Sequence, residues 1–471
     1  MRVSCGALLS VLLVAGVPAV QPEAGARRIT WPDVAPVHAR LEAAGFAEAD
    51  FAARIDALAR DNARRVRLGD LDHLVFYLLQ STRFTTQPAI EPALSAKVLV
   101  DALDAPARVA FFDDPATARG RVPPDVRARM ATFMRAVDSP DDDVRLAYFG
   151  RLLADAAPET RHRENVLVGE YLRVMRFVHE KEFGAGRTDA AAAATLYRTR
   201  GLSTDTAVEA GFLVAQGLGV LRALEPTRRV RRVLIVGAGL DLAPRTALLE
   251  AAPPQSYQPW AVVDALVGLG LSRLDDLDVV AADINPRVVL HLRTTDVGMR
   301  PLVLLTGIGD QGPVALAPDY RDYFRTLGRA IGQVEDATPS SGRLHKRLRI
   351  SPDATRVVRA EPLDVVTERL VRRNAGGGGL ATDAFDLVVA TNVFPYFDAD
   401  ALVLAMVNIA SMLAPDGVLL HNEARPALHE IAAELGLPAA HSRHAVIATV
   451  QGAAPLGDSV WLHTRQASTA H

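Results

Sequence analysis

A glycine turn that follows a buried apolar run is the first feature of this chain that could do chemistry. Residues 233–241 read VLIVGAGLD, which predicts a strand, a tight turn with Gly237 and Gly239, and then a helix. Glycine lets the backbone turn sharply and approach a ligand where any Cβ would intrude. Free N–H groups at the start of the helix can then bind an electronegative group of that ligand. Taken alone, the motif is also compatible with a tight turn that binds nothing.

A carboxylate follows the second predicted strand. Asp283 comes directly after the predicted strand 278–282, whose last four residues are apolar. A carboxylate at this place can accept hydrogen bonds from both hydroxyls of a ribose, because two cis hydroxyls match two oxygens. The separation from the glycines exceeds the usual ~20 residues, and an insertion at 251–277 accounts for the excess. The alternative role of Asp283 is to cap the next helix.

Seven short apolar runs after residue 227 predict the strands of an α/β sheet. They alternate with helical patterns, and their continuous hydrophobicity is typical of strands buried on both faces of a mostly parallel sheet. The last two runs are separated by a short loop, which favours an antiparallel hairpin at the sheet edge. We therefore expect a Rossmann-like, seven-stranded sheet. The predicted strands are 232–236, 278–282, 355–359, 386–390, 418–421, 445–450 and 459–464.

Polar side chains follow the fourth and fifth predicted strands. Ligands of open α/β sheets bind outside the carboxyl ends of the strands, so these side chains are candidates for catalysis. Asn392 could orient an amine or amide, and Tyr396 could stack on a substrate or donate a hydrogen bond. His421 could act as a base and Glu423 could contact the substrate. Ordinary packing and structural hydrogen bonding are the alternative roles of these residues.

The residues before the sheet predict a mostly helical N-terminal domain, 27–226. Apolar side chains recur there at helical spacing over 35–67, 70–80, 125–137, 144–156, 165–183 and 206–224. Gly184 is placed to end the fifth of these helices. The remaining domain, 227–471, carries the insertion at 251–277 and a larger one at 306–353. We expect a helix at 320–331 within the larger insertion.

The first 26 residues have the layout of a secretory signal. Arg2 precedes an apolar stretch over residues 3–20, and an A-x-A-like site at 24–26 follows. The stretch is near the lower length limit for a membrane span, so an uncleaved anchor that tethers the chain to a membrane is the second interpretation. A buried N-terminal helix or a mis-assigned start is the third. A secretory signal or an anchor would place the chain outside the cytoplasm or at a membrane, and the third interpretation would not. The location of the chain therefore stays open.

Composition excludes several classes of site. The formal net charge is −3, which gives no overall attraction to nucleic acid. Cys5 is the only cysteine, so an internal disulfide and a cysteine-based metal site are both excluded. His73 and His179 have no partners at ligand spacing, and we expect no metal site.

Residues 232–464 resemble the class I S-adenosylmethionine-dependent methyltransferase superfamily. The turn at 237–241 is similar to its first motif, in the G-x-G-x-D form of the leucine carboxyl methyltransferase branch. Asp283 matches the ribose-binding acid, and Glu361–Asp364 matches the region where an acid meets the adenine amine. Residues 385–393 resemble the fourth motif, and 413–419 resemble the turn before the fifth strand. Three positions depart from the family pattern, namely Asp241, Ile235 and Asp416.

The resemblance implies that S-adenosylmethionine is the cofactor and that a methyl group is transferred to an unidentified small molecule or protein side chain. The implied cofactor-binding residues are Gly237, Ala238, Gly239, Asp241, Asp283, Ile284, Asp364 and Thr391. In relatives, the region just before the sheet folds over the cofactor, so Arg200 is a candidate partner of the methionine carboxylate. A catalytically inactive binding or regulatory protein is the alternative. A dinucleotide enzyme is less expected, because Asp241 replaces the third small residue of that fingerprint.

Overall fold

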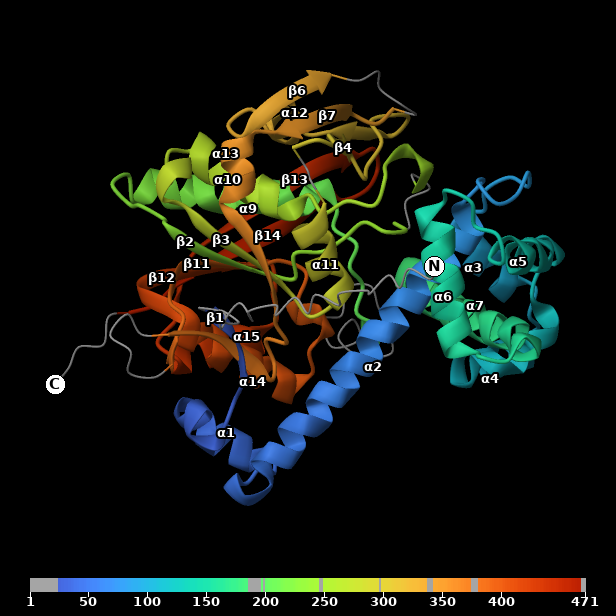
Figure 1. The fold of residues 1–471 in the computed structure, drawn as a ribbon, viewed down its shortest axis with the longest axis horizontal. Coiled ribbons are helices and arrows are strands. Elements are labelled where there is room, and N and C mark those ends of the chain that lie inside the picture. Colours follow the sequence, from blue (N-terminus) through green and yellow to red (C-terminus); the bar gives the residue numbers. More distant parts are fainter. Residues whose placement is uncertain are drawn as a thin grey trace, which may run out of the picture.

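An eight-stranded sheet forms the centre of the molecule, and a separate body of helices lies beside it (Figure 1). The computed structural model describes residues 24–184, 196–197, 200–244, 249–295, 298–336, 342–373 and 380–466. The apolar stretch 3–20, predicted as a signal or anchor, lies outside the described residues. Within the described parts of the chain, we find no helix with the length and apolar character needed to cross a membrane.

The order of the strands in the large sheet is that of an open α/β fold. The strands in spatial order are β5 (Val314–Leu316), β13 (Ala439–Val450), β14 (Leu456–Thr464), β12 (Leu413–His421), β11 (Phe385–Ala390), β2 (Arg232–Val236), β3 (Asp278–Asp283) and β8 (Val358–Pro362). The five strands from β12 to β8 are parallel. The chain builds outward from β2 in both directions, so a crevice opens between the carboxyl ends of β2 and β11, where such folds bind ligands.

The expected Rossmann-like sheet is thus confirmed, with two corrections. The antiparallel hairpin is present as β13 and β14, but the sheet has eight strands because β5, from the 306–353 insertion, pairs with β13. The third predicted strand is misplaced. Ser351 caps a short helix, α13 (Pro352–Arg356), by accepting a hydrogen bond from the N–H of Ala354, and β8 begins only after that helix. Serine followed by proline is a helix start signal, and it displaces the strand.

Helices cover both faces of the large sheet. The helices α9 (Val208–Leu224) and α10 (Gln258–Gly268) pack on the face that receives Val233 and Ile235 of β2. The helices α14 (Ala399–Met412) and α15 (Pro426–Glu434) pack on the opposite face, which receives Leu234 and Val236. Alternate residues of a strand point to opposite faces, so these continuous apolar strands fill two cores at once.

The start of the chain belongs to one of these cores. The strand β1 (Ala24–Arg28) pairs antiparallel with β9 (Glu368–Arg373), which also pairs with β10 (Leu380–Thr382). The short helices η1 (Trp31–Val37) and α1 (His38–Ala43) follow. Beyond them, Phe51 and Ile55 pack in the same core as Leu234. The predicted helical segment therefore also contributes to the core of the α/β sheet. The division of the chain into domains at residues 27 and 227 stays a prediction.

One long helix connects the sheet to the helical body. The two helices predicted before residue 80 form a single one, α2 (Glu48–Gln80), whose second half is almost entirely buried. Around it pack α3 (Pro92–Asp101), α4 (Ala105–Asp113), η2 (Pro115–Arg121), α5 (Pro124–Ala136), α6 (Val144–Ala156) and α7 (Thr160–Phe183), which ends at Gly184 as predicted. The core of this body also contains Ala238, Leu240 and Ala281, so the helices pack onto the region of the glycine turn.

The larger insertion contributes two of the three strands of a small sheet that the sequence patterns did not predict, and the third strand directly precedes the insertion. The strands β4 (Leu302–Leu305), β7 (His345–Ile350) and β6 (Gly332–Asp336) pair antiparallel, and β7 alternates buried and exposed side chains. The helix predicted at 320–331 is α12 (Pro318–Thr326). It ends before Gly328, whose positive φ of 92° cannot continue a helix.

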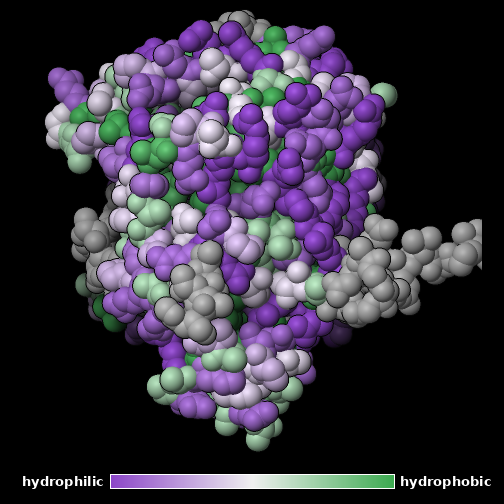
Figure 2. Space-filling view, turned by 90° about the vertical axis from the view of Figure 1, so that its left-hand side faces the viewer, coloured by the Kyte–Doolittle hydropathy of each residue, from purple (hydrophilic) through white to green (hydrophobic). Residues whose placement is uncertain are grey.

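The face of the molecule drawn in Figure 2 is predominantly hydrophilic.

Candidate functional site

The glycine turn and Asp283 lie in direct contact at the carboxyl ends of β2 and β3. Gly237 and Gly239 have φ values of 75° and 73°, which side-chain-bearing residues rarely adopt. The N–H of Gly237 donates to the carbonyl of Ala282 over 2.9 Å, and the N–H of Gly239 donates to Oδ2 of Asp283 over 3.0 Å. The two features predicted to share one nucleoside are therefore joined by a hydrogen bond.

Two backbone N–H groups donate to the Asp283 carboxylate, and Asp283 is not the N-cap of the next helix. Its Oδ1 accepts a hydrogen bond from the N–H of Asn285 over 2.8 Å. Asn285 is itself the N-cap of α11 (Pro286–Thr294), because its side chain accepts from the N–H of Arg287. Burial raises the pKa of the Asp283 carboxyl to about 6, against the lowering effect of the two N–H donors. The capping role considered for Asp283 is thus taken by Asn285.

A small cavity of about 100 Å³ opens beside this contact. Of the predicted site residues, it is lined by Gly237, Gly239, Asp283, Ile284, Asp364, Thr391, Asn392 and Tyr396. Ala238 is fully buried behind the turn, where its N–H donates to the carbonyl of Ala282, and it does not line the cavity. Asp241 lies at a second cavity. The structure therefore brings eight of the predicted residues to one cavity, from segments far apart in the chain.

A segment just before α9 covers the glycine turn. The N–H of Leu240 donates to the carbonyl of Thr204 over 2.7 Å, and the Thr204 hydroxyl donates to the carbonyl of Leu240 over 2.8 Å. A Cβ on Gly239 would lie 2.0 Å from Oγ1 of Thr206. Gly239 is therefore required by the close approach of residues 204–206, which also line the cavity.

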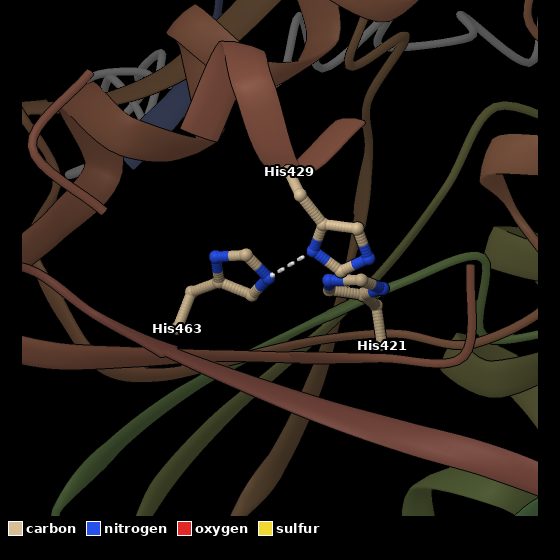
Figure 3. Close-up of side chains that lie close together, drawn as sticks. All are labelled: His421, His429 and His463. Carbon is tan, nitrogen blue, oxygen red and sulfur yellow. Dashed lines mark hydrogen bonds between the residues drawn. The ribbon is translucent and has the colours of Figure 1, made fainter. Parts of the chain in front are cut away.

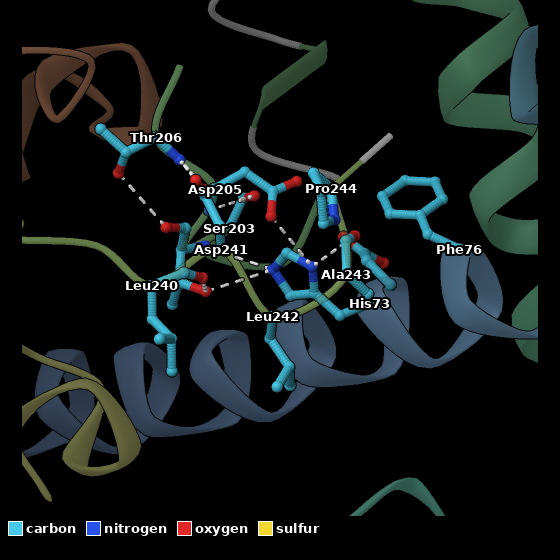
Figure 4. Close-up of polar contacts among 12 residues, drawn as sticks. His73, Phe76, Ser203, Asp205, Thr206, Leu240, Asp241, Leu242, Ala243 and Pro244 are labelled. Carbon is cyan, nitrogen blue, oxygen red and sulfur yellow. Dashed lines mark hydrogen bonds and ion pairs between the residues drawn. The ribbon is translucent and has the colours of Figure 1, made fainter. Parts of the chain in front are cut away.

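His73 of α2 holds that covering segment (Figure 4). Its Nε2 accepts a hydrogen bond from the N–H of Thr204 at 3.3 Å, so the proton of the neutral ring is on Nδ1. Nδ1 faces the carbonyl of Ala243 at 3.2 Å and Oδ1 of Asp205 at 3.3 Å. His73 is fully buried. Its role is to tie the helical body to the site, which no spacing along the sequence indicated.

Asp364 lies at the far side of the small cavity and is joined to α2. Both of its carboxylate oxygens accept from Nδ2 of Asn62, at 3.2 and 3.1 Å. Oδ2 also accepts from the Thr367 hydroxyl at 2.7 Å. Asn62 lines the cavity together with Gln258, whose amide donates to the Thr391 hydroxyl over 2.9 Å. Asn62 and Gln258 were missed from the sequence, because neither belongs to a motif.

A larger cavity of about 330 Å³ adjoins the small one. Five residues line both cavities, namely Ser203, Asp205, Thr206, Asn392 and Tyr396. The larger cavity also contains Asp241 and Arg200. Burial raises the pKa of Asp241 well above its ordinary value, and the charge of Asp205 acts in the same direction. Arg200 donates to the Tyr396 hydroxyl at 3.3 Å and lies 3.5 Å from the Asp72 carboxylate.

Asn392 adopts an unusual conformation where the two cavities meet. Its φ of 59° is in the left-handed region, which asparagine tolerates better than most residues. Its N–H donates to Oδ1 of Asn422, and Nδ2 of Asn422 donates back to Oδ1 of Asn392, both over 2.8 Å. Asn422 is held in turn by Asp458. Such reciprocal bonding fixes both the backbone and the amide of Asn392.

His421 and Glu423, the other candidates at this edge, line neither cavity. His421 is fully buried and lies against His429 and His463 (Figure 3). The Glu423 carboxylate accepts from the N–H of Arg425 and forms an ion pair of 3.0 Å with its guanidinium. The structure therefore does not bring these two residues together with Asn392 and Tyr396.

Comparison with known proteins gives structural neighbours only. No protein-family model and no curated protein matches the chain. Among solved structures, N-methyltransferase NodS from Bradyrhizobium japonicum WM9, in complex with S-adenosyl-L-homocysteine, is 14% identical. It aligns over 54% of this chain and 87% of its own, with a TM-score of 0.26. The magnesium protoporphyrin IX methyltransferase from Synechocystis PCC 6803, with bound S-adenosylmethionine, is 8% identical. It aligns over 62% of this chain and 97% of its own, with a TM-score of 0.27. A TehB-like methyltransferase from Corynebacterium glutamicum is 12% identical. It aligns over 55% and 89% of the two chains, with a TM-score of 0.25.

Alignments this distant do not bear on activity. The strand order of the large sheet and the contacts around Asp283 are the observations on which a function can be argued.

Proposed function

We propose that this chain binds S-adenosylmethionine in the small cavity and transfers its methyl group to an acceptor held in the larger one. The observation that carries the proposal is the contact between Gly239 and Asp283 at the crevice between β2 and β11. A backbone turn without side chains and a buried carboxylate there match the two needs of an adenosyl group, close approach and hydroxyl recognition.

The residues around the small cavity suit a nucleoside. Asp283 offers oxygens to the ribose hydroxyls, and its two backbone donors orient the carboxylate. Ile284 and Leu363 supply apolar surface for a base, and Asp364 supplies an acceptor for an exocyclic amine. Asp364 already accepts from Asn62 and Thr367, so an adenine amine there would complete a network that is held in position in advance.

The junction of the cavities suits the methionine portion. Arg200 lines the larger cavity and is buried, so its guanidinium is placed to pair with a carboxylate. Asp72 also forms an ion pair of 2.5 Å with Arg173, so its charge is shared between two arginines. The guanidinium of Arg200 therefore keeps positive charge for a ligand. Bound S-adenosylmethionine would supply an electrophilic methyl group at this junction. Asn392 and Tyr396 line both cavities and would orient the acceptor toward it.

The acceptor would be a small molecule, because a volume of about 330 Å³ for the larger cavity is in the range of small-molecule sites. Burial raises the pKa of Asp241, which favours the protonated form that can donate a hydrogen bond there; the ionised form can accept a proton from a nucleophile.

The proposal is tested by the formation of S-adenosylhomocysteine. The purified chain is incubated with S-adenosylmethionine and either the small-molecule or the protein fraction of a cell extract. We expect S-adenosylhomocysteine to accumulate with the small-molecule fraction, and the Asp283→Ala variant to lose most of that activity. Accumulation with neither fraction, while the cofactor still binds, would contradict methyl transfer and leave a binding protein.

A further inference from the structure

Three histidines from separate elements converge beneath α15, away from both cavities (Figure 3). His421 ends β12, His463 lies in β14, and His429 lies in α15. In the pairing of β12 with β14, His421 is opposite Trp461 and therefore lies on the same sheet face as His463, two residues further on. One nitrogen of each ring lies within 4.8 Å of the others.

Each of the three rings presents a nitrogen atom toward the other two. Nδ1 of His429 is 3.2 Å from Nε2 of His463. Nδ1 of His463 is 2.7 Å from the carbonyl of Leu437, so it carries the proton of that ring and leaves a lone pair on Nε2. A backbone carbonyl in this position is the usual outer partner of a histidine that binds a metal. Nε2 of the fully buried His421 has no hydrogen-bond partner among the described residues.

We propose that His421, His429 and His463 form a binding site for one divalent transition-metal ion, with Zn²⁺ as the best match. Three imidazoles are a known zinc ligand set, and the imidazole ligand favours Zn²⁺ over Mg²⁺ or Ca²⁺. The ion takes the place of the proton shared by His429 and His463 and gives the orphaned nitrogen of His421 a partner. The site was not expected from the sequence, because the three residues have no ligand spacing along the chain.

The surroundings keep the three ligands available. Burial lowers the pKa of all three imidazoles, which favours the ring form that has a lone pair. The ring centroids of Trp461 and His429 are 4.5 Å apart. Phe394 packs edge-on against His421, with 5.6 Å between the ring centroids. Both fix ring orientation. His429 is only partly buried, which leaves a route for the ion from solvent.

One hydrogen bond must change when the ion binds. Nδ1 of His421 accepts from the backbone N–H of Glu423 at 3.0 Å. A ring that binds a metal through Nε2 carries its proton on Nδ1, which can no longer accept. The N–H of Glu423 therefore turns away, within the irregular residues that join β12 to α15. The loss of one hydrogen bond is small beside the binding free energy of a structural zinc ion.

The test uses the full chain after treatment with a chelator. We expect calorimetry to show one Zn²⁺ bound per chain, and Zn²⁺ to raise the unfolding temperature. His429→Gln should weaken binding at least tenfold and remove the thermal shift. His444→Gln, at an exposed histidine of the neighbouring β13, is the matched control and should bind as the wild type does. Equal affinity in His429→Gln and the wild type would overturn the proposal, as would the absence of binding by the wild type.

Two further measurements need no variant. Co²⁺, used as a spectroscopic probe, should give the visible absorption of an ion bound by nitrogen ligands. Added Zn²⁺ should displace the Co²⁺ and remove that absorption. The Glu423 amide should exchange its hydrogen faster when Zn²⁺ is present, because its acceptor is lost. An unchanged exchange rate with Zn²⁺ bound would place the ion elsewhere. Both readouts are independent of cofactor binding, so this proposal and the proposed function can fail separately.

Discussion

The backbone N–H of Gly239 donates a 3.0 Å hydrogen bond to the Asp283 carboxylate, which joins the turn after the first parallel strand to the end of the second. One residue lacks a side chain and the other is a buried acid. The pairing places a stretch of backbone without a side chain next to a carboxylate at the crevice of the sheet.

Gly239 should be far less tolerant of a side chain than another glycine in the same backbone conformation. Gly239→Ala combines a φ of 73° with a Cβ 2.0 Å from the Thr206 hydroxyl. Gly436→Ala has a φ of 71° but nothing within 4 Å of the Cβ. We expect Gly436→Ala to cost about 1–2 kcal/mol of unfolding free energy in denaturant titrations. Gly239→Ala should cost more and should also weaken S-adenosylhomocysteine binding. Equal costs would show that residues 204–206 do not press on the turn.

Cofactor affinity should depend on the ionisation of Asp283. Its pKa is raised to about 6 from 3.8, so the carboxyl of the ligand-free chain is mostly protonated below pH 6. Hydroxyl donors bind the ionised form, and affinity for S-adenosylhomocysteine should therefore fall about tenfold between pH 7 and pH 5. Binding near pH 6 should release protons, which calorimetry in two buffers of different ionisation enthalpy measures. Asp283→Asn should bind more weakly at pH 7 and lose this pH dependence; a retained dependence would assign it to another group.

The same shift has the opposite effect on the stability of the ligand-free chain. A raised carboxyl pKa contributes stability that is fully present below pH 3.8 and is lost as the pH rises through about 6. Asp283→Asn should therefore gain stability relative to the wild type as the pH rises from about 4 to about 7, as measured by urea unfolding. A difference between the two chains that does not vary with pH would contradict the raised pKa.

Arg200 should recognise the methionine carboxylate and not the nucleoside. Arg200→Gln is expected to weaken S-adenosylhomocysteine binding by about 1.5–3 kcal/mol, the loss of a charged hydrogen bond. Affinity for methylthioadenosine, which lacks the carboxylate, should be unchanged. Equal weakening of both ligands would indicate that the variant disturbs the fold of residues 200–206 instead. Arg161→Gln, at an exposed arginine of α7, is the control.

The sheet and the glycine turn could be predicted because their signals are local. The runs at 232–236 and 278–282 are apolar after their first residue, and each leads into the residues that face the crevice. The third strand was misplaced because Ser351 and Pro352 start a helix that continues to Arg356, into the predicted range of the strand. The small sheet of β4, β7 and β6 was missed, because its strands are short and both β6 and β7 are rich in polar residues.

The rest of the site depends on packing between distant elements. Asn62 and His73 reach the site from α2, a helix whose pattern indicates only a buried face. Arg200 was a candidate from the family resemblance and its position before the sheet, but its contact with Tyr396 could be found only from the fold. His421 was placed at the correct edge of the sheet, yet its side chain points under α15 rather than into the crevice.

Calorimetric titration of the wild type and Asp283→Ala with S-adenosylhomocysteine tests the central claim most directly. The proposed site predicts measurable binding by the wild type and a loss of about 1–3 kcal/mol in the variant, because two hydroxyls lose their acceptor. Asp113→Ala, at an exposed position in α4, should bind as the wild type does. Equal affinity in Asp283→Ala, or no binding by the wild type, would contradict the account.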